Sequence, residues 1–429
     1  CGLAAAAATL VPDEALTLYA IIGHVNDVAV INAARERLAS PAVIAAKRAE
    51  AQALTHDLTA PVAAQTGDPR FDAYCRQAMR DNVLRGGWPV RLGGHIYHLY
   101  GRRHGDLERD YNAFYLPAEF YSQGNASYRD VNQNRRCDVL LNPAVGDAEV
   151  LAFLGLIQAD GYNPLTVLGS RFVVPTERQA AILTLVDRPE TLRPLLGQPF
   201  TPGQLLKAVA AQGVGLGVAP EVFVEAVLAQ AEFGEGFWVD HWFYNLDLLD
   251  AYLAVYPDRK DELLFAKTVP YAQSPAFVQP RERKSVLRED GAARHTGVRQ
   301  YDAVVEDPEV AALMASRTAA RNLMRTAHGQ GEVFRATVFS KLVGLALIKF
   351  ATLDPLGMGI EMEAGKPGWC DALNGLPGLF GSSMSETYEL LRLLDFLLAD
   401  LTPSTPPPTR GDLTPPAPSP MRGDLTPPA

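Results

Sequence analysis

Residues 233–258 read FGEGFWVDHWFYNLDLLDAYLAVYPD. The spacing of their apolar residues predicts a helix over 240–255, with Asp240 as its N-cap. His241 and Trp242 fall in its first turn, where we expect them to line a cleft, whereas the leucines that follow belong to a core. A metal site is not expected here, because no second histidine stands at ligand spacing from His241.

The same helical periodicity recurs on both sides of this segment. Asp27 is expected to cap a helical region over 27–59 that Pro41 divides, and a further helix is expected over 67–87. Other helices are expected at 107–119, 147–159, 176–186, 202–212, 220–232, 307–327, 336–351 and 384–400. Strands are scarce after residue 24, and long polar loops join the helices. This pattern favours a mainly α fold, an (α/α)6 toroid or barrel, over a plain bundle with short loops.

The two ends of the chain differ from this helical body. TLVPDEALTLYAIIGHV is rich in β-branched and aromatic residues and predicts the closing strand of a β-sandwich. Because the chain begins with Cys1, we expect a piece of a longer protein, with a lipid-anchored Cys1 as the alternative. The C-terminal RGDLTPP repeats predict a disordered tail. The expected divisions are a sandwich remnant at 1–24, a helical linker at 25–66, an incomplete barrel domain at 67–400 and the tail at 401–429.

Composition excludes several classes of protein. A net charge of -10 argues against nucleic-acid binding, which needs a basic face. The four cysteines form no CxxC pair, so neither a zinc site nor a disulfide framework is expected. We expect a cytoplasmic protein whose thiols are reduced. No stretch has the roughly 20 apolar residues that a membrane helix needs, so no membrane partner is expected either.

The segment YRDVNQNRR, residues 128–136, concentrates side chains that bind hydroxyl groups. Arg129, Asp130, Gln133 and Asn134 offer forked donors and acceptors that are costly to bury unless a ligand or a neighbour satisfies them. We expect a loop that packs against the core and contacts substrate; the alternative is a solvated loop with surface ion pairs.

The segment GKPGWCDALNG, residues 365–375, holds the best candidate for a catalytic carboxyl group. Asp371 lies beside Trp369, and an aromatic neighbour with partial burial keeps a carboxyl protonated, as a general acid requires. The alternative is an aspartate that caps a turn. No GxSxG elbow or P-loop is present, and GVGLG at 213–217 lacks the strand that a dinucleotide site needs.

These two motifs resemble those of cellobiose phosphorylase-type glycoside phosphorylases, glycoside hydrolase family 94, in the (α/α)6-barrel clan. The resemblance implies a general acid at Asp371, with Trp369 shaping the sugar site. Cys370 stands where the family has Asn. YRDVNQNRR is similar to the family's Arg-Asp-x-x-Gln-Asp element, which implies that Arg129, Asp130 and Gln133 bind the non-reducing sugar. The remaining expected substrate-binding residues are Asn134, at the family's Asp position, Asp240, His241, Trp242 and Asn374.

The implied reaction is inverting phosphorolysis of β-glucosides and β-gluco-oligosaccharides to α-glucose 1-phosphate. Inorganic phosphate would be the co-substrate, no cofactor is implied, and the family's dimers suggest a homodimer. A β-glucan hydrolase or transglycosylase is the first alternative, with Glu361, Glu363 or Asp240 as a base about 6.5–9.5 Å from the acid. An inactive fragment that only binds glycans is the second.

Overall fold

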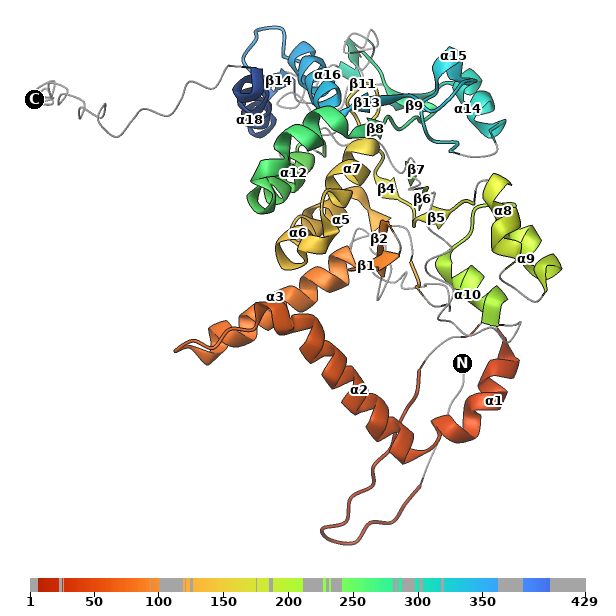
Figure 1. Ribbon diagram of the computed structural model, residues 1–429. Coiled ribbons are helices and arrows are strands. Elements are labelled where there is room, and N and C mark those ends of the chain that lie inside the picture. The colour runs from red at the N-terminus through yellow and green to blue at the C-terminus, as the bar shows by residue number, and fades with distance from the viewer. Residues whose placement is uncertain are drawn as a thin grey trace, which may run out of the picture.

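The computed structural model describes most of the chain between residues 7 and 401. The described residues are 7–22, 25, 27–92, 94–99, 119, 121–123, 126–174, 176–184, 188–210, 227–228, 231–232, 241–280, 283, 285–287, 298–300, 304–317, 320–361 and 381–401. They form a mainly helical structure with several small sheets (Figure 1). The mainly α prediction is therefore confirmed.

Three N-terminal helices have the boundaries that their capping residues predict. They are α1 (Val28–Leu38), α2 (Pro41–Thr59) and α3 (Pro69–Gly86). The Asp27 carboxylate accepts the backbone N–H of Ala29 at 2.8 Å, and Pro41 opens the second helix. Gly87 ends the third with a φ of 84°, a conformation that glycine adopts without a Cβ clash.

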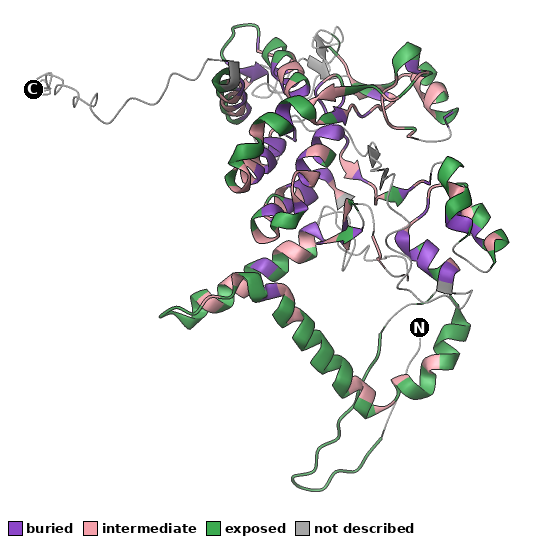
Figure 2. Cartoon of the chain, viewed as in Figure 1, coloured by how far each residue is buried: buried purple, intermediate pink, exposed green. Residues whose placement is uncertain are grey.

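The first two helices and the segment before them contribute little to the core (Figure 2). No residue of α1 is buried, and in α2 only Thr59 is. Residues 7–22 contain no strand, and Ile22 is 96 % exposed. The predicted strand is thus not formed over these residues, because an isolated extended segment has no neighbouring strand to satisfy its backbone.

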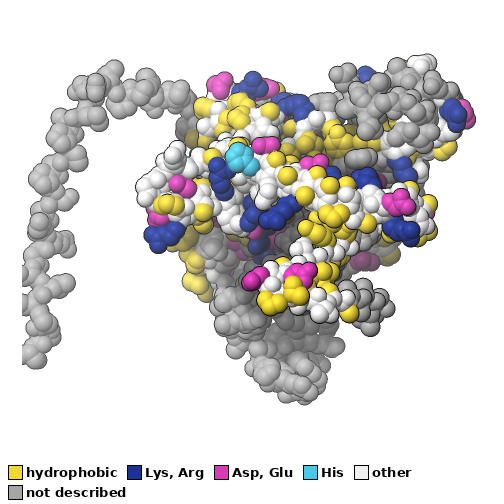
Figure 3. All heavy atoms as spheres, turned by 90° about the horizontal axis from the view of Figure 1, so that it is seen from below, with side chains coloured by type: hydrophobic (Ala, Val, Ile, Leu, Met, Phe, Trp, Pro, Cys, Tyr) yellow, Lys and Arg dark blue, Asp and Glu magenta, His cyan; other side chains and the backbone are white. Residues whose placement is uncertain are grey.

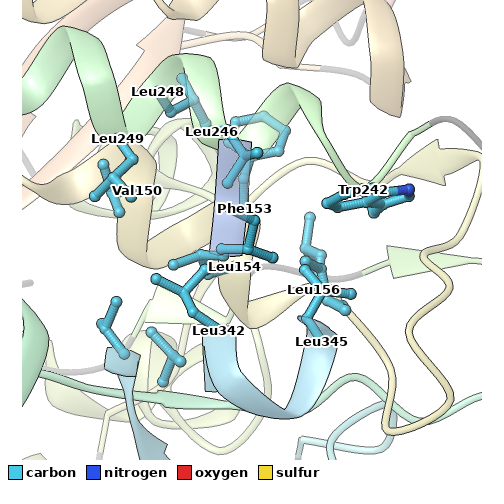
Figure 4. Packing of buried hydrophobic residues seen from close by; sticks show 14 of the residues in the cluster. Val150, Phe153, Leu154, Leu156, Trp242, Leu246, Leu248, Leu249, Leu342 and Leu345 are labelled. Atoms are coloured by element: carbon cyan, nitrogen blue, oxygen red, sulfur yellow. The ribbon is translucent and has the colours of Figure 1, made fainter. Parts of the chain in front are cut away.

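The main core lies between five longer helices and one short one. They are α5 (Tyr128–Arg135), α6 (Asp138–Leu141), α7 (Ala148–Gly155), α12 (Tyr244–Val255), α16 (Val338–Ala351) and α18 (Met384–Leu401). Helix α12 packs against α5, α6 and α7, and α16 packs against α18. In Figure 4, Phe153 of α7, Leu246 of α12 and Leu342 of α16 meet in one apolar cluster.

A second core forms around a hairpin and three further helices. Its elements are β1 (Trp88–Leu92), β2 (His95–Leu99), β5 (Arg171–Phe172), α8 (Thr176–Leu183), α9 (Pro189–Leu196) and α10 (Pro202–Ala210). The hairpin is antiparallel, with Val90 opposite Tyr97. The Tyr97, Phe172 and Phe200 rings stack in succession at centroid distances of 6.0 and 6.4 Å. This core, like the main one, is held by buried apolar side chains.

The small sheets are all antiparallel and tie together segments distant in sequence. Strand β3 (Ala126–Ser127) pairs with β4 (Thr166–Val167), which pairs with β7 (Ala231–Glu232); β5 pairs with β6 (Val227–Leu228). The other pairs are β8 (Thr268–Pro270) with β13 (Arg335–Thr337), β9 (Ala276–Val278) with β12 (Val304–Glu306), β10 (Ser285–Leu287) with β11 (Val298–Gln300), and β14 (Ile360–Glu361) with β15 (Ser382–Ser383). Strands are thus more frequent than the sequence predicted.

Two predicted helices are wrong in whole or in part. The described part of 220–232 forms β6 and β7, because their backbones pair with β5 and β4. The helix predicted over 307–327 is only α14 (Pro308–Ala315), followed by a turn and the short α15 (Thr326–Gly329). Residues 107–118 and the tail from 402 lie outside the described residues. The described helices do not establish a ring of six hairpins, which remains a prediction.

Candidate functional site

The predicted sugar-binding residues of the segment 128–136 lie on helix α5, not on a loop. Asp130 in the first turn and Arg135 in the last have the charges that a helix dipole favours at those ends. Arg129 and Asp130 are half-buried and form an ion pair, with Nη2 and Oδ1 3.3 Å apart. Asn134 donates its amide N–H to the Asp130 carbonyl at 2.6 Å, so this side chain is engaged within the helix. Gln133 is half-buried.

His241 and Trp242 lie in the turn before α12, which begins at Tyr244 rather than at residue 240. Phe243 is the N-cap, and the aromatic rings of this turn pack on one another, so the helix starts later than its periodicity suggests. Trp242 is only 1 % exposed, and its indole N–H donates to Glu386 Oε2 at 3.4 Å. This contact joins the start of α12 to α18.

Tyr128 links the start of α5 to the same turn. Its ring stacks on His241, with a centroid distance of 5.9 Å and an interplanar angle of 10°. Its hydroxyl and the Asn245 side chain are hydrogen-bonded, at 2.9 Å between Asn245 Nδ2 and the hydroxyl oxygen. Burial raises the pKa of Tyr128 well above its ordinary value, so the hydroxyl stays neutral and can both donate and accept.

The segment that carries Trp369, Asp371 and Asn374 lies outside the described residues, as does Asp240. The two ends of that segment are described. They meet in the β14–β15 pair, where Glu361 lies opposite Ser382. The Asp354 carboxylate accepts hydrogen bonds from Ser382 Oγ at 2.6 Å and from the Gly359 N–H at 2.8 Å. The Ser382 hydroxyl, followed by backbone N–H groups, holds the pKa of Asp354 below its ordinary value, so this carboxylate clamps both ends.

A further set of buried polar side chains lies against the turn that holds His241 and Trp242. Asn163 is 1 % exposed, and its Nδ2 lies 3.4 Å from His241 Nδ1. The Lys349 ammonium lies over the Tyr162 ring, 4.6 Å from its centroid, and 5.7 Å from that of Trp242. Asn163 Oδ1 has no hydrogen-bond partner among the described residues. A buried oxygen left unpaired costs about 1–3 kcal/mol, which marks this position for a polar group from a ligand or from the rest of the chain.

A second buried polar cluster joins the hairpin to the helices beneath it. His98 Nε2 lies 3.0 Å from Asp138 Oδ2 and 3.0 Å from Glu149 Oε1, and Arg135 Nη1 lies 3.9 Å from the other Glu149 oxygen. Burial and the Arg135 charge lower the pKa of His98, but the Glu149 and Asp138 carboxylates outweigh them and raise it above its ordinary value. When His98 is protonated, the cluster holds two cations, His98 and Arg135, beside the carboxyl groups of Asp138 and Glu149.

The ligand atoms of His98, Asp138 and Glu149 lie within 4.8 Å of one another, which is the composition and spacing of a metal site. A divalent cation would, however, have to share Glu149 with Arg135. We therefore interpret these four residues as a buried ion network. Sequence reasoning missed it because its members come from β2, α5, α6 and α7, and no local spacing connects them.

Comparisons with protein-family models and with curated protein sequences give no match for this chain. Within the described part of the chain, none of the helices combines the length and apolar composition required to cross a bilayer. Acidic and basic side chains of described residues are interspersed on the face shown in Figure 3.

The buried polar cluster at the turn with His241 and Trp242 is the candidate site. It contains Asn163, Lys349 and Glu386, which sequence reasoning had not singled out.

Proposed function

We propose that this chain is the catalytic part of an inverting glycoside phosphorylase that converts β-glucosides to α-glucose 1-phosphate. Asp371 is the general acid in this proposal. Arg129, Asp130 and Gln133, with Trp369 and His241, bind the glucosyl unit.

The observation that supports this proposal is a chain of contacts between the anchors of the three sugar-binding segments. Tyr128, which precedes Arg129, stacks on His241. Trp242 then bonds to Glu386, which follows the β14–β15 pair at the base of the segment with Asp371. Residues close in sequence to three distant segments thus meet in one buried cluster of aromatic and polar groups, which supports a site to which all three segments contribute.

The chemistry of phosphorolysis needs only one protein carboxyl group. Asp371 would protonate the glycosidic oxygen as the bond to the anomeric carbon breaks through an oxocarbenium-like state. Phosphate, which is already a competent nucleophile, would attack the opposite face of the sugar and invert its configuration. The half-buried Arg129–Asp130 ion pair would offer donors and acceptors for the sugar hydroxyls.

The test is incubation of the protein with β-linked glucose disaccharides, with and without inorganic phosphate. The proposal requires α-glucose 1-phosphate, formed only when phosphate is present. Free glucose released without phosphate would instead indicate a hydrolase, and the absence of both products would indicate a catalytically inactive fragment.

The assigned acid is tested by Asp371→Asn, which removes the transferable proton. We expect turnover to fall about a hundredfold or more, since a positioned acid contributes about 10²–10⁴ in rate. Asp395→Asn, at an exposed position on α18, is the matched control and should keep full activity. Retained activity in Asp371→Asn, with unchanged unfolding, would remove Asp371 from this role.

A further inference from the structure

The orientation of the Asn163 side-chain amide follows from its surroundings. The atom assigned as Nδ2 lies 3.2 Å from the Pro164 carbonyl oxygen, which can only accept a hydrogen bond. The opposite orientation would place Asn163 Oδ1 against that carbonyl, with two acceptors facing each other. The amide nitrogen therefore points to Pro164, and Oδ1 points to the buried position without a described partner.

The same nitrogen faces the imidazole of His241, 3.4 Å from Nδ1. An amide nitrogen donates and does not accept, so the Nδ1 atom that it faces must carry a lone pair. A neutral imidazole with an unprotonated Nδ1 carries its proton on Nε2. We propose that Asn163 is a positioning residue that holds His241 as the neutral tautomer with its proton on Nε2.

The neighbours of His241 strengthen this constraint. The ring is stacked against Tyr128 and tilted against Tyr244, with both centroids at 5.9 Å, so these side chains restrict its rotation. Protonation of Nδ1 would set an N–H of His241 against an N–H of Asn163. His241 therefore keeps its proton on Nε2, and Asn163 Oδ1 is a further buried polar atom with no hydrogen-bond partner among the described residues.

This arrangement indicates which chemical group would bind at the candidate site. A fixed imidazole donor suits an oxygen acceptor such as a sugar hydroxyl, and the adjacent Asn163 carbonyl oxygen suits the hydroxyl's proton. The sugar assignment rests on the proposed function, whereas the tautomer does not.

The tautomer can be measured by two-bond ¹H–¹⁵N correlation NMR on the full chain with ¹⁵N-labelled histidine. The His241 signal is assigned by its loss in His241→Gln, and the exposed His56 serves as the internal reference. We expect an unprotonated Nδ1 and a protonated Nε2 in the wild type. A protonated Nδ1 there would overturn the proposal, whatever the enzymatic activity.

Two variants sharpen the test. Asn163→Asp replaces the donor by an acceptor, so the major form of His241 should become one with a proton on Nδ1. Asn163→Leu removes the constraint and should give a mixture of tautomers. An unchanged His241 spectrum in folded Asn163→Asp would contradict the positioning role.

Glycoside binding is measured separately on the same variants. Loss of one oriented donor should raise KM for a β-linked disaccharide about tenfold, with a smaller change in kcat. If the wild type shows the predicted tautomer but neither binds nor turns over glycosides, the proposed function fails while the positioning role of Asn163 stands.

Discussion

The N-terminal helices and the central helices form for different reasons. Helix α1 has an N-cap aspartate and good helix formers, yet none of its residues is buried. Helix α12 has no side-chain cap, yet half of its length is buried against α5, α6 and α7. Local signals thus suffice to specify a helix. Only packing buries polar side chains such as Asn163 and His241 away from water, where their hydrogen bonds are strong and their orientations are fixed.

The largest test of this contrast removes one large apolar side chain from each region. Phe153 is 1 % exposed, so Phe153→Ala should lower the free energy of unfolding by about 4 kcal/mol through lost burial and a residual cavity. Phe71, which is 51 % exposed on α3, is the matched control, and its alanine variant should stay within about 0.5 kcal/mol. Urea denaturation measures both; equal losses would erase the distinction.

The next largest effect concerns the buried ion network. His98→Leu removes the charged partner of Asp138 and leaves Glu149 with Arg135 alone, and it should cost about 3 kcal/mol of stability at pH 6. Because the folded pKa of His98 is raised, its stabilising contribution is complete below about pH 6.5 and is lost as the pH rises through the folded value. The difference in free energy of unfolding between the wild type and the variant should therefore shrink as the pH is raised from 5 to 9, as measured by denaturation series. A constant difference across that range would show that the network does not titrate this way.

A smaller, local effect is expected at the base of the segment with Asp371. Asp354→Ala removes the acceptor shared by the Ser382 hydroxyl and the backbone N–H groups of Leu356, Met358 and Gly359. Hydrogen exchange at Ile360 should accelerate, while exchange in α12 stays unchanged. Because the folded pKa of Asp354 is lowered, the wild-type clamp is present above its ordinary pKa and is lost as the pH falls through the folded value. Unchanged exchange in the variant would assign the β14–β15 pairing to other contacts.

The smallest effect compares two N-caps. The Thr337 hydroxyl accepts the Ser340 N–H at 3.1 Å at the start of the packed helix α16, so Thr337→Ala should lower global stability by about 1 kcal/mol. Asp27→Ala removes the same kind of bond from α1, but this helix is not packed. It should fray α1 in hydrogen exchange without moving the global unfolding midpoint. A shift of that midpoint would show that α1 is coupled to the core.

The parts of the fold that sequence predicts best are those set by neighbouring residues. The N-cap Asp27 and the first-turn Pro41 gave correct helix starts because each acts within one turn. Helix α5 was missed because its polar residues suggest a loop. Its buried face is stabilised by partners such as Asn245 that lie more than a hundred positions away.

The candidate site shows the same division. His241 and Trp242 could be selected from sequence by residue type beside a helix start, and both lie in the buried cluster. Asn163 and Glu386 could not, because a single polar residue has no pattern and their relation to His241 and Trp242 exists only after folding. Asp371 and Trp369 remain predictions from the motif.

The antiparallel pairing of Ile360 with Ser383 has an evolutionary consequence. A segment whose ends meet at one ladder can be lengthened, shortened or exchanged with little effect on α16 and α18, because each doubling of a loop adds only about 0.6 kcal/mol of closure entropy. Under the proposed function, substrate preference would therefore diversify by replacement of residues 362–381 as one unit, without change to the helices on either side.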